Sequence, residues 1–180
     1  MKDIFIKEEF PDLVIMAIQI FDENNMRELP DNERFRICNE ILRNDQDESK
    51  RWDAVWLIGE LAEDPKDENH LRNDVANVLE WVLRNDTNGV VKHEASFQIA
   101  ARNLRHKINV LMDVALYDKS VLSKHEAIES LGLMRAFEVE DKIKDALKDP
   151  SVDVRETAAF VLKRLDRIRE HGEYKPSAIL

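Results

Sequence analysis

A short pattern recurs four times along this chain of 180 residues. A basic residue is followed by two variable residues and an alanine, and an aliphatic residue lies four positions after the alanine. The copies are Arg51-Trp52-Asp53-Ala54 with Ile58, Lys92-His93-Glu94-Ala95 with Ile99, Lys124-His125-Glu126-Ala127 with Leu131, and Arg155-Glu156-Thr157-Ala158 with Leu162. The alanines are offset by 41, 32 and 31 residues. These intervals fit one helix-turn-helix unit, so the pattern indicates an array of helical hairpins.

The chemistry of the pattern suits the first helix of each hairpin. An alanine and the aliphatic residue four positions later lie on one helical face, and the small alanine lets the neighbouring repeat come close. The basic residue is expected to stay at the surface. The second and third positions of the pattern, which include His93-Glu94 and His125-Glu126, are left free to differ between repeats.

The remaining helices follow from apolar stripes at helical spacing. Second helices are predicted over Leu71 to Leu83, Lys107 to Leu116 and Val139 to Leu147, and a closing helix over Val152 to Arg169. Upstream, Asp12 to Phe21 and Glu33 to Leu42 predict one more pair. Turn signals separate the units at 64–65, 85–89, 118–120 and 149–151.

The predicted fold class is therefore all-α, an α-α superhelix or HEAT-like repeat solenoid of about four to five helical hairpins. Only 4 Gly and 5 Pro are present, which suits helices joined by brief turns. We expect a single domain over 1–170 and a C-terminal tail over 171–180. Its repeats are placed near 11–48, 50–88, 91–120 and 123–150, with the final helix over 152–170.

The charge of the chain limits its partners. A net charge of −10 argues against nucleic acid and anionic membrane surfaces, and favours basic proteins or metal cations. The most apolar stretch, 13–20, is too short to span a bilayer, and the first residues lack the pattern of a signal peptide. Cys38 is the one cysteine, so no internal disulfide forms. Together these features predict a cytoplasmic protein.

The two His-Glu dipeptides are the candidate site. Equivalent positions of stacked repeats lie side by side, about 8 to 10 Å apart between helix axes, so His93, Glu94, His125 and Glu126 are expected to converge. Imidazole and carboxylate ligands of this mix suit Fe, Mn or Zn. A glutamate in the first turn also interacts well with the helix dipole, so each dipeptide alone is an ordinary helix start. Two aligned copies are harder to explain in that way.

The segment Lys124-His125-Glu126-Ala127-Ile128-Glu129-Ser130-Leu131-Gly132 resembles the short HEAT-like repeats first noted in phycobiliprotein lyases. Within this class, His-Glu dipeptides in consecutive repeats are similar to those of deoxyhypusine hydroxylase, a di-iron enzyme that hydroxylates a modified lysine on a translation factor. Each half of that family has four repeats, of which the middle two carry His-Glu. The fourth carries a Val-x-Glu-Thr sequence similar to Val154-Arg155-Glu156-Thr157.

Residues 50–165 cover one such half. The resemblance implies that His93, Glu94, His125 and Glu126 are iron ligands in a metal-dependent hydroxylase. It also implies four further ligands from a second half, which a homodimer would replace.

Two hypotheses follow. The first is a metal-binding protein whose site is completed across a homodimer, and the second is a non-enzymatic scaffold that binds basic protein partners along its curved surface. Converging side chains in the paired positions would favour the metal, and outward, diverging side chains would favour the scaffold.

Overall fold

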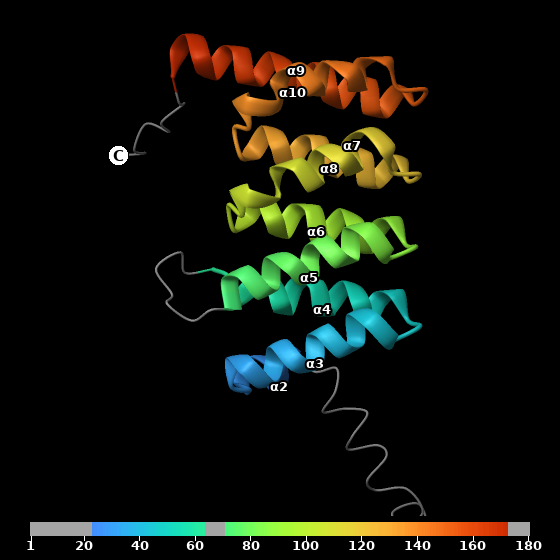
Figure 1. The fold of residues 1–180 in the computed structure, drawn as a ribbon, viewed down its shortest axis with the longest axis vertical. Helices are drawn as coiled ribbons and strands as arrows, with labels where there is room; N and C mark the ends of the chain where they lie inside the picture. Colours follow the sequence, from blue (N-terminus) through green and yellow to red (C-terminus); the bar gives the residue numbers. More distant parts are fainter. Residues whose placement is uncertain (1–22, 64–70, 173–180) are drawn as a thin grey trace, which may run out of the picture.

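The chain folds as a stack of helical hairpins. The computed structural model describes residues 23–63 and 71–172, and within these ranges every regular element is a helix and no strand is present. Figure 1 shows the helices lying in layers, from α2 and α3 at one end of the stack to α10 at the other. The architecture is the all-helical superhelix that the sequence predicts.

The helices alternate between two sides of the stack. On one side α4, α6, α8 and α10 pack in sequence, and on the other α3, α5 and α7 do so. The α-helices are α2 (Glu23–Glu28), α3 (Asp31–Asn44), α4 (Glu48–Glu60), α5 (Leu71–Asn85), α6 (Gly89–Ala101), α7 (Ile108–Tyr117), α8 (Val121–Leu133), α9 (Glu140–Ile143) and α10 (Val152–His171). Three 3-10 segments join them, η1 (Arg105–Lys107), η2 (Phe137–Val139) and η3 (Lys144–Lys148). The four copies of the sequence pattern thus form one continuous layer of helices.

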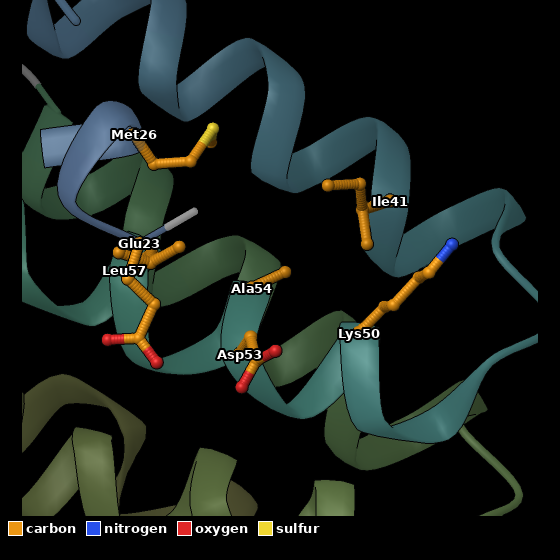
Figure 2. A pocket seen from close by; sticks show the side chains of 7 residues that line it. All are labelled: Glu23, Met26, Ile41, Lys50, Asp53, Ala54 and Leu57. Carbon is orange, nitrogen blue, oxygen red and sulfur yellow. The ribbon is translucent and has the colours of Figure 1, made fainter. Parts of the chain in front are cut away.

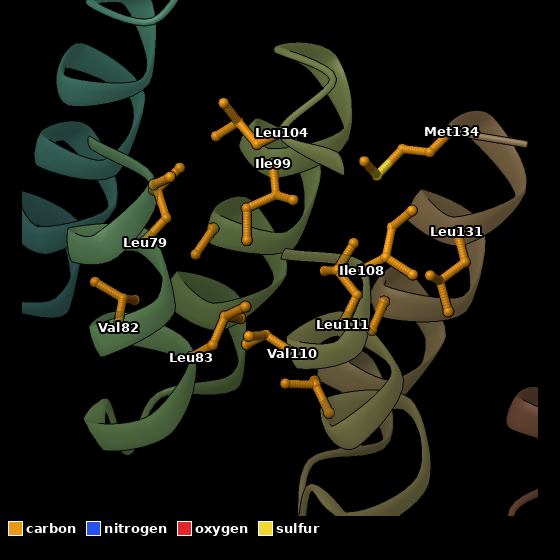
Figure 3. Packing of buried hydrophobic residues seen from close by; sticks show 14 of the residues in the cluster. Leu79, Val82, Leu83, Ile99, Leu104, Ile108, Val110, Leu111, Leu131 and Met134 are labelled. Carbon is orange, nitrogen blue, oxygen red and sulfur yellow. The ribbon is translucent and has the colours of Figure 1, made fainter. Parts of the chain in front are cut away.

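The alanines of the pattern lie where these helices meet. Ala54, Ala95, Ala127 and Ala158 are at most 1% exposed, as the repeat predicts. The aliphatic partners Ile58, Ile99 and Leu131 are fully buried, whereas Leu162 is only partly buried because α10 is the last helix of the described stack. Figure 3 shows the core between α5, α6, α7 and α8, which is filled by leucine, isoleucine and valine side chains from all four helices.

The basic residues of the pattern are not free at the surface, so that prediction was wrong. Lys92 Nζ lies 2.6 Å from Asp118 Oδ2, and the lysine side chain is only 14% exposed. Lys124 and Asp149 form the same pair at the same distance. Arg51 pairs with Asp86 at 2.7 Å. Each of these three basic residues therefore ties the first helix of its repeat to the turn that begins the next one, whereas Arg155 of α10 donates to the backbone carbonyls of Asp149 and Pro150.

The aspartates of these pairs also shape the turns. Asp118 Oδ1 accepts a hydrogen bond from the backbone N–H of Ser120, which is itself the N-cap of α8. Asp86 and Asn88 repeat this arrangement before α6. Because the cap side chains satisfy backbone N–H groups of the first turn, helices α6 and α8 begin at equivalent places. This common start is what aligns the candidate site residues.

Some predicted helices differ from the observed ones. The helix predicted over Val139 to Leu147 is broken into α9 and η3, with Ile143 and Ala146 buried at a spacing of three that suits a 3-10 turn. The helix predicted over 12–21 lies outside the described residues, and α2 is a short helix that the sequence did not indicate. No helix in the described ranges is long and apolar enough to cross a membrane.

Candidate metal-binding site

The two His-Glu dipeptides occupy matching places on adjacent helices. His93 and Glu94 lie in α6, after the N-cap Asn88, and His125 and Glu126 lie in α8, after the N-cap Ser120. Because α6 and α8 pack directly against each other, the two dipeptides face the same inter-repeat boundary. Because the two capped helix starts are equivalent, the two dipeptides lie at the same height on adjacent helices.

One contact joins the two dipeptides. His93 Nε2 lies 3.1 Å from Glu126 Oε2, across the boundary between consecutive repeats. The histidine side chain is 33% exposed and the glutamate side chain 6% exposed, so the contact sits at the edge of the buried surface. The side chains of His93 and Glu126 therefore converge, whereas the contacts described below for Glu94 and His125 are with other residues.

Both carboxylates of the site are buried, and their hydrogen-bond partners are neutral. Glu94 and Glu126 are each 5% exposed. The Gln98 side-chain amide donates to Glu94 Oε1 at 2.8 Å, and Ser130 Oγ lies 3.3 Å from Glu126 Oε1 and 3.0 Å from the backbone carbonyl of Ser96. Gln98 and Ser130 are the residues one helical turn after each glutamate, so both carboxylates are held from within their own helix.

Burial is the largest influence on the pKa values of the site, although the hydrogen bonds of Gln98 and Ser130 and the charge of Arg102 act against it at the carboxylates. Burial, helped by the neighbouring Glu129, raises the pKa of Glu126 to about 7, and Glu94 pushes it in the same direction. Burial also raises the pKa of Glu94. The pKa of His93 is lowered, first by burial and then by the nearby His125. Each of these shifts disfavours the charged form of its group.

His125 is oriented by the following helix. Its Nδ1 lies 2.7 Å from the Thr157 hydroxyl of α10, and its Nε2 lies 3.7 Å from Glu129 Oε2. The ring is 35% exposed, close to the value for His93. Both imidazoles are therefore held at one nitrogen while remaining accessible from solvent.

The preceding repeat carries a different pair in the same positions. Trp52 stacks on Trp56 at a ring-centroid distance of 6.2 Å, and Trp56 stacks on Phe97 of α6 at 6.3 Å, so these aromatic side chains pack together. Asp53 takes the position of the glutamates. Figure 2 shows that it lines a separate, mainly apolar pocket between α2, α3 and α4. The pKa of Asp53 is raised by burial and by the negative charges of Glu23 and Asp47. The His-Glu arrangement is thus confined to α6 and α8 within the described repeats.

Sequence reasoning did not place three side chains that touch the site, although Thr157 entered through the family resemblance. Gln98, Ser130 and Thr157 contact Glu94, Glu126 and His125, respectively. A signal for the first two was present, because each is a polar residue on a buried helical face one turn after a glutamate. His106, in contrast, is exposed.

The donor set suits a divalent cation. In the described ranges no three His, Cys, Asp or Glu side chains are already arranged around one ion position. Two imidazoles and two desolvated carboxylates are nevertheless brought to one boundary, where Glu94 adds to the raised pKa of Glu126 and Arg102 offsets part of the effect of burial on the pKa of Glu94. A divalent cation would supply the missing positive charge, and this mixture of nitrogen and oxygen ligands suits iron, zinc or manganese.

In sequence, the chain is similar to deoxyhypusine hydroxylases. No protein-family model matches the chain. Deoxyhypusine hydroxylase from Bos taurus is 34% identical over 98 residues, which cover 52% of this chain and 32% of that protein. The Gallus gallus enzyme is 36% identical over 90 residues, covering 49% of this chain and 30% of that protein. The matched segments therefore span about a third of these relatives.

A solved structure extends the likeness in three dimensions. Human deoxyhypusine hydroxylase in complex with glycerol matches with a TM-score of 0.67 and 22% sequence identity, over 83% of this chain and 49% of that one. This similarity shows the fold. The chain resembles one half of a deoxyhypusine hydroxylase.

Proposed function

We propose that the chain binds iron through His93, Glu94, His125 and Glu126 and has a metal-dependent function related to that of deoxyhypusine hydroxylase. The observation that carries the proposal is the contact between His93 and Glu126 across the repeat boundary. It places a nitrogen and an oxygen donor from different repeats within reach of one ion. Zinc or manganese would suit the same donors.

The protein's own groups divide the work in this proposal. The imidazoles of His93 and His125 would supply nitrogen ligands from the solvent-accessible side of the site. The carboxylates of Glu94 and Glu126 would supply oxygen ligands from its buried side. Gln98 holds one oxygen of Glu94, and Ser130 lies against one oxygen of Glu126, whose other oxygen faces His93 Nε2. When bound by histidine and carboxylate ligands with open positions, non-haem iron activates dioxygen for hydroxylation.

The proposal includes a second copy of the chain. One copy offers two histidines and two glutamates, whereas the resemblance implies twice that number for two iron ions. A homodimer with the two sites facing each other would supply the complete set. Each copy carries a charge of −10, so the two repel at low ionic strength unless cations lie between them. We therefore expect dimerisation to depend on the metal.

Metal analysis tests the ligand assignment. Freshly purified protein and protein reconstituted anaerobically with Fe²⁺ are compared with a His93→Ala/His125→Ala double variant. The matched control is His106→Ala/His171→Ala, which removes two exposed histidines outside the site. We expect stoichiometric iron in the wild type and in the control, and loss of iron in the site variant. Equal, near-zero iron, zinc and manganese in all three proteins would rule the assignment out.

The dimer is tested separately by multi-angle light scattering with and without Fe²⁺. A rise from the monomer mass of 21.0 kDa to twice that value on metal addition supports the proposal. A protein that binds iron and stays monomeric would refute the shared site while leaving the ligands in place.

The acidic charge is also the basis of the second candidate, a scaffold for basic protein partners. Pull-downs at low and high salt test it. We expect a scaffold to recover the same basic partner from both the wild type and the His93→Ala/His125→Ala variant, since its surface charge would not depend on a metal.

A further inference from the structure

The Val154-Arg155-Glu156-Thr157 sequence supplies none of the proposed metal ligands, yet its threonine contacts one of them, His125. Thr157 occupies the third position of the repeat pattern, which Glu94 and Glu126 occupy in the two preceding repeats. It lies in α10 and is 7% exposed. A neutral hydroxyl group thus stands where the next carboxylate of the series would be.

The hydrogen bonds of Thr157 define its role. Its hydroxyl donates to the backbone carbonyl of Asp153 at 2.7 Å, a bond that threonines commonly make within helices. A hydroxyl has a single proton, so towards His125 Nδ1, also at 2.7 Å, the Thr157 oxygen acts as the acceptor. Nδ1 of the neutral His125 ring then carries the proton. The lone pair is left on Nε2, on the far side of the ring, where Glu129 Oε2 lies 3.7 Å away, beyond hydrogen-bond distance.

His93 has a different partner at the equivalent place. There the third-position residue of the next repeat is Glu126, and it faces Nε2 of the ring rather than Nδ1. The two histidines therefore present different nitrogens to the following helix. Where the third position of the next repeat is a glutamate, it faces Nε2 of the histidine, and where it is a threonine, it faces Nδ1.

We propose that Thr157 is a positioning residue that fixes the orientation and the tautomer of His125, so that Nε2 is free to bind a metal ion. The inference rests on the proposed function, in which His125 Nε2 is a metal ligand. Partners of this kind, which hold the second nitrogen of a metal-binding histidine, set both the ring orientation and the metal affinity. The proposal gives the Val-x-Glu-Thr sequence a task in the site.

The test compares Thr157→Val, which removes the hydroxyl while keeping the shape, with Thr157→Ser, which keeps the hydroxyl. Thr87→Val makes the same chemical change at an exposed position and serves as the control. Thermal unfolding of all three variants shows whether the fold is retained. The first readout needs no metal: long-range ¹H–¹⁵N spectra at pH 8 report the tautomer of each histidine, and a His125→Gln spectrum assigns the signals.

We expect His125 of the wild type, Thr157→Ser and Thr87→Val to carry its proton on Nδ1, and Thr157→Val to lose this preference. A His125 ring protonated on Nε2 in the wild type would overturn the proposal. The second readout is the dissociation constant for Fe²⁺ under anaerobic conditions. We expect Thr157→Val to weaken binding roughly 10- to 100-fold and Thr157→Ser to restore it.

The two readouts separate the inference from the proposed function. Wild-type affinity in a folded Thr157→Val variant would overturn the role of Thr157 and leave the proposed function standing. A wild type with the expected tautomer and no Fe²⁺ binding would overturn the proposed function, and with it the metal-related role of Thr157.

Discussion

His93 Nε2 lies 3.1 Å from Glu126 Oε2, although the two residues belong to different repeats. The contact depends on two equivalent helix starts, since Asn88 caps α6 and Ser120 caps α8 in the same way. It brings an imidazole against a carboxylate that is buried without a cationic side chain hydrogen-bonded to it. The folded protein therefore keeps a pair of donor groups whose charged forms are both disfavoured.

The first prediction concerns the pH dependence of stability in metal-free protein. The pKa of Glu126 is about 7 in the fold, against an ordinary value of 4.5, so between these pH values the folded state binds more protons than the unfolded state. The contribution of Glu126 to the free energy of unfolding is therefore constant below about pH 4.5, declines up to about pH 7 and is level above it. The decline amounts to roughly 2 to 4 kcal/mol.

Urea unfolding of the wild type and Glu126→Gln at pH 5 and pH 8 measures this effect. The glutamine variant should gain stability relative to the wild type on going from pH 5 to pH 8. Glu156→Gln, at an exposed position, should show no such change. A difference between the wild type and Glu126→Gln that is the same at both pH values would show that Glu126 titrates normally.

The second prediction links the α4 helix to the site. A Cβ atom at Gly59 would meet the Gln98 side chain, with its Cδ only 2.7 Å away, and Gln98 is the group that holds Glu94. Gly59→Ala should therefore destabilise the fold by about 1 to 2 kcal/mol, because overpacking outweighs the better helix propensity of alanine.

Combining Gly59→Ala with Gln98→Ala provides the control. Once the glutamine is shortened the collision disappears, and the Gly59→Ala change should then stabilise the protein by about 0.5 to 1 kcal/mol. Urea midpoints of the four proteins in this cycle decide the matter. Equal effects of Gly59→Ala in both backgrounds would mean that the two side chains do not compete for space.

The third prediction concerns the ion pairs that join neighbouring repeats. Asp118→Asn keeps the side-chain acceptor that bonds to the Ser120 N–H but removes the charge that faces the largely buried Lys92. We expect a loss of about 1 to 3 kcal/mol in the free energy of unfolding. Asp141→Asn breaks a pair with Lys144 at a similar distance, 2.7 Å, but on the exposed surface. It should cost clearly less than Asp118→Asn, and a comparable loss in both variants would contradict the structural distinction.

The fourth prediction concerns Cys38, which is fully buried in α3. Burial raises the pKa of its thiol to about 12. Because the thiolate is the reactive form, a thiol reagent at pH 8 should modify native protein at least about a hundredfold more slowly than protein unfolded in urea. Absorbance or mass spectrometry follows the reaction. Equal rates would show that α3 opens readily.

Much of the fold follows from the sequence because the repeat pattern records which side chains must be small. Ala95 and Ala127 are buried at helix contacts, as their spacing predicts. The burial of Lys92 was not foreseen, since a basic residue alone indicates solvent and its partner Asp118 lies in a turn 26 residues away. The break in the helix at 139–147 likewise depends on local packing that the apolar stripe does not record.

The candidate site shows a similar division. The convergence of the two dipeptides follows from equivalent positions in stacked repeats, and the contact of His93 with Glu126 agrees with it. The choice of ring nitrogen does not follow, because it depends on side-chain rotamers and on what the next helix presents. Thr157 was noticed in the sequence as part of a family resemblance, and only the structure places its hydroxyl against His125.

The placement of His93 and Glu126 on successive layers has a mechanical consequence. A solenoid flexes by small changes of angle between adjacent repeats, and such a change alters every distance that crosses the boundary. Widening the angle on the side of the site would draw the imidazole from the carboxylate, and narrowing it would press them together. An ion bound between them would hold the angle between these two repeats fixed, while the other repeat boundaries of the solenoid could still flex.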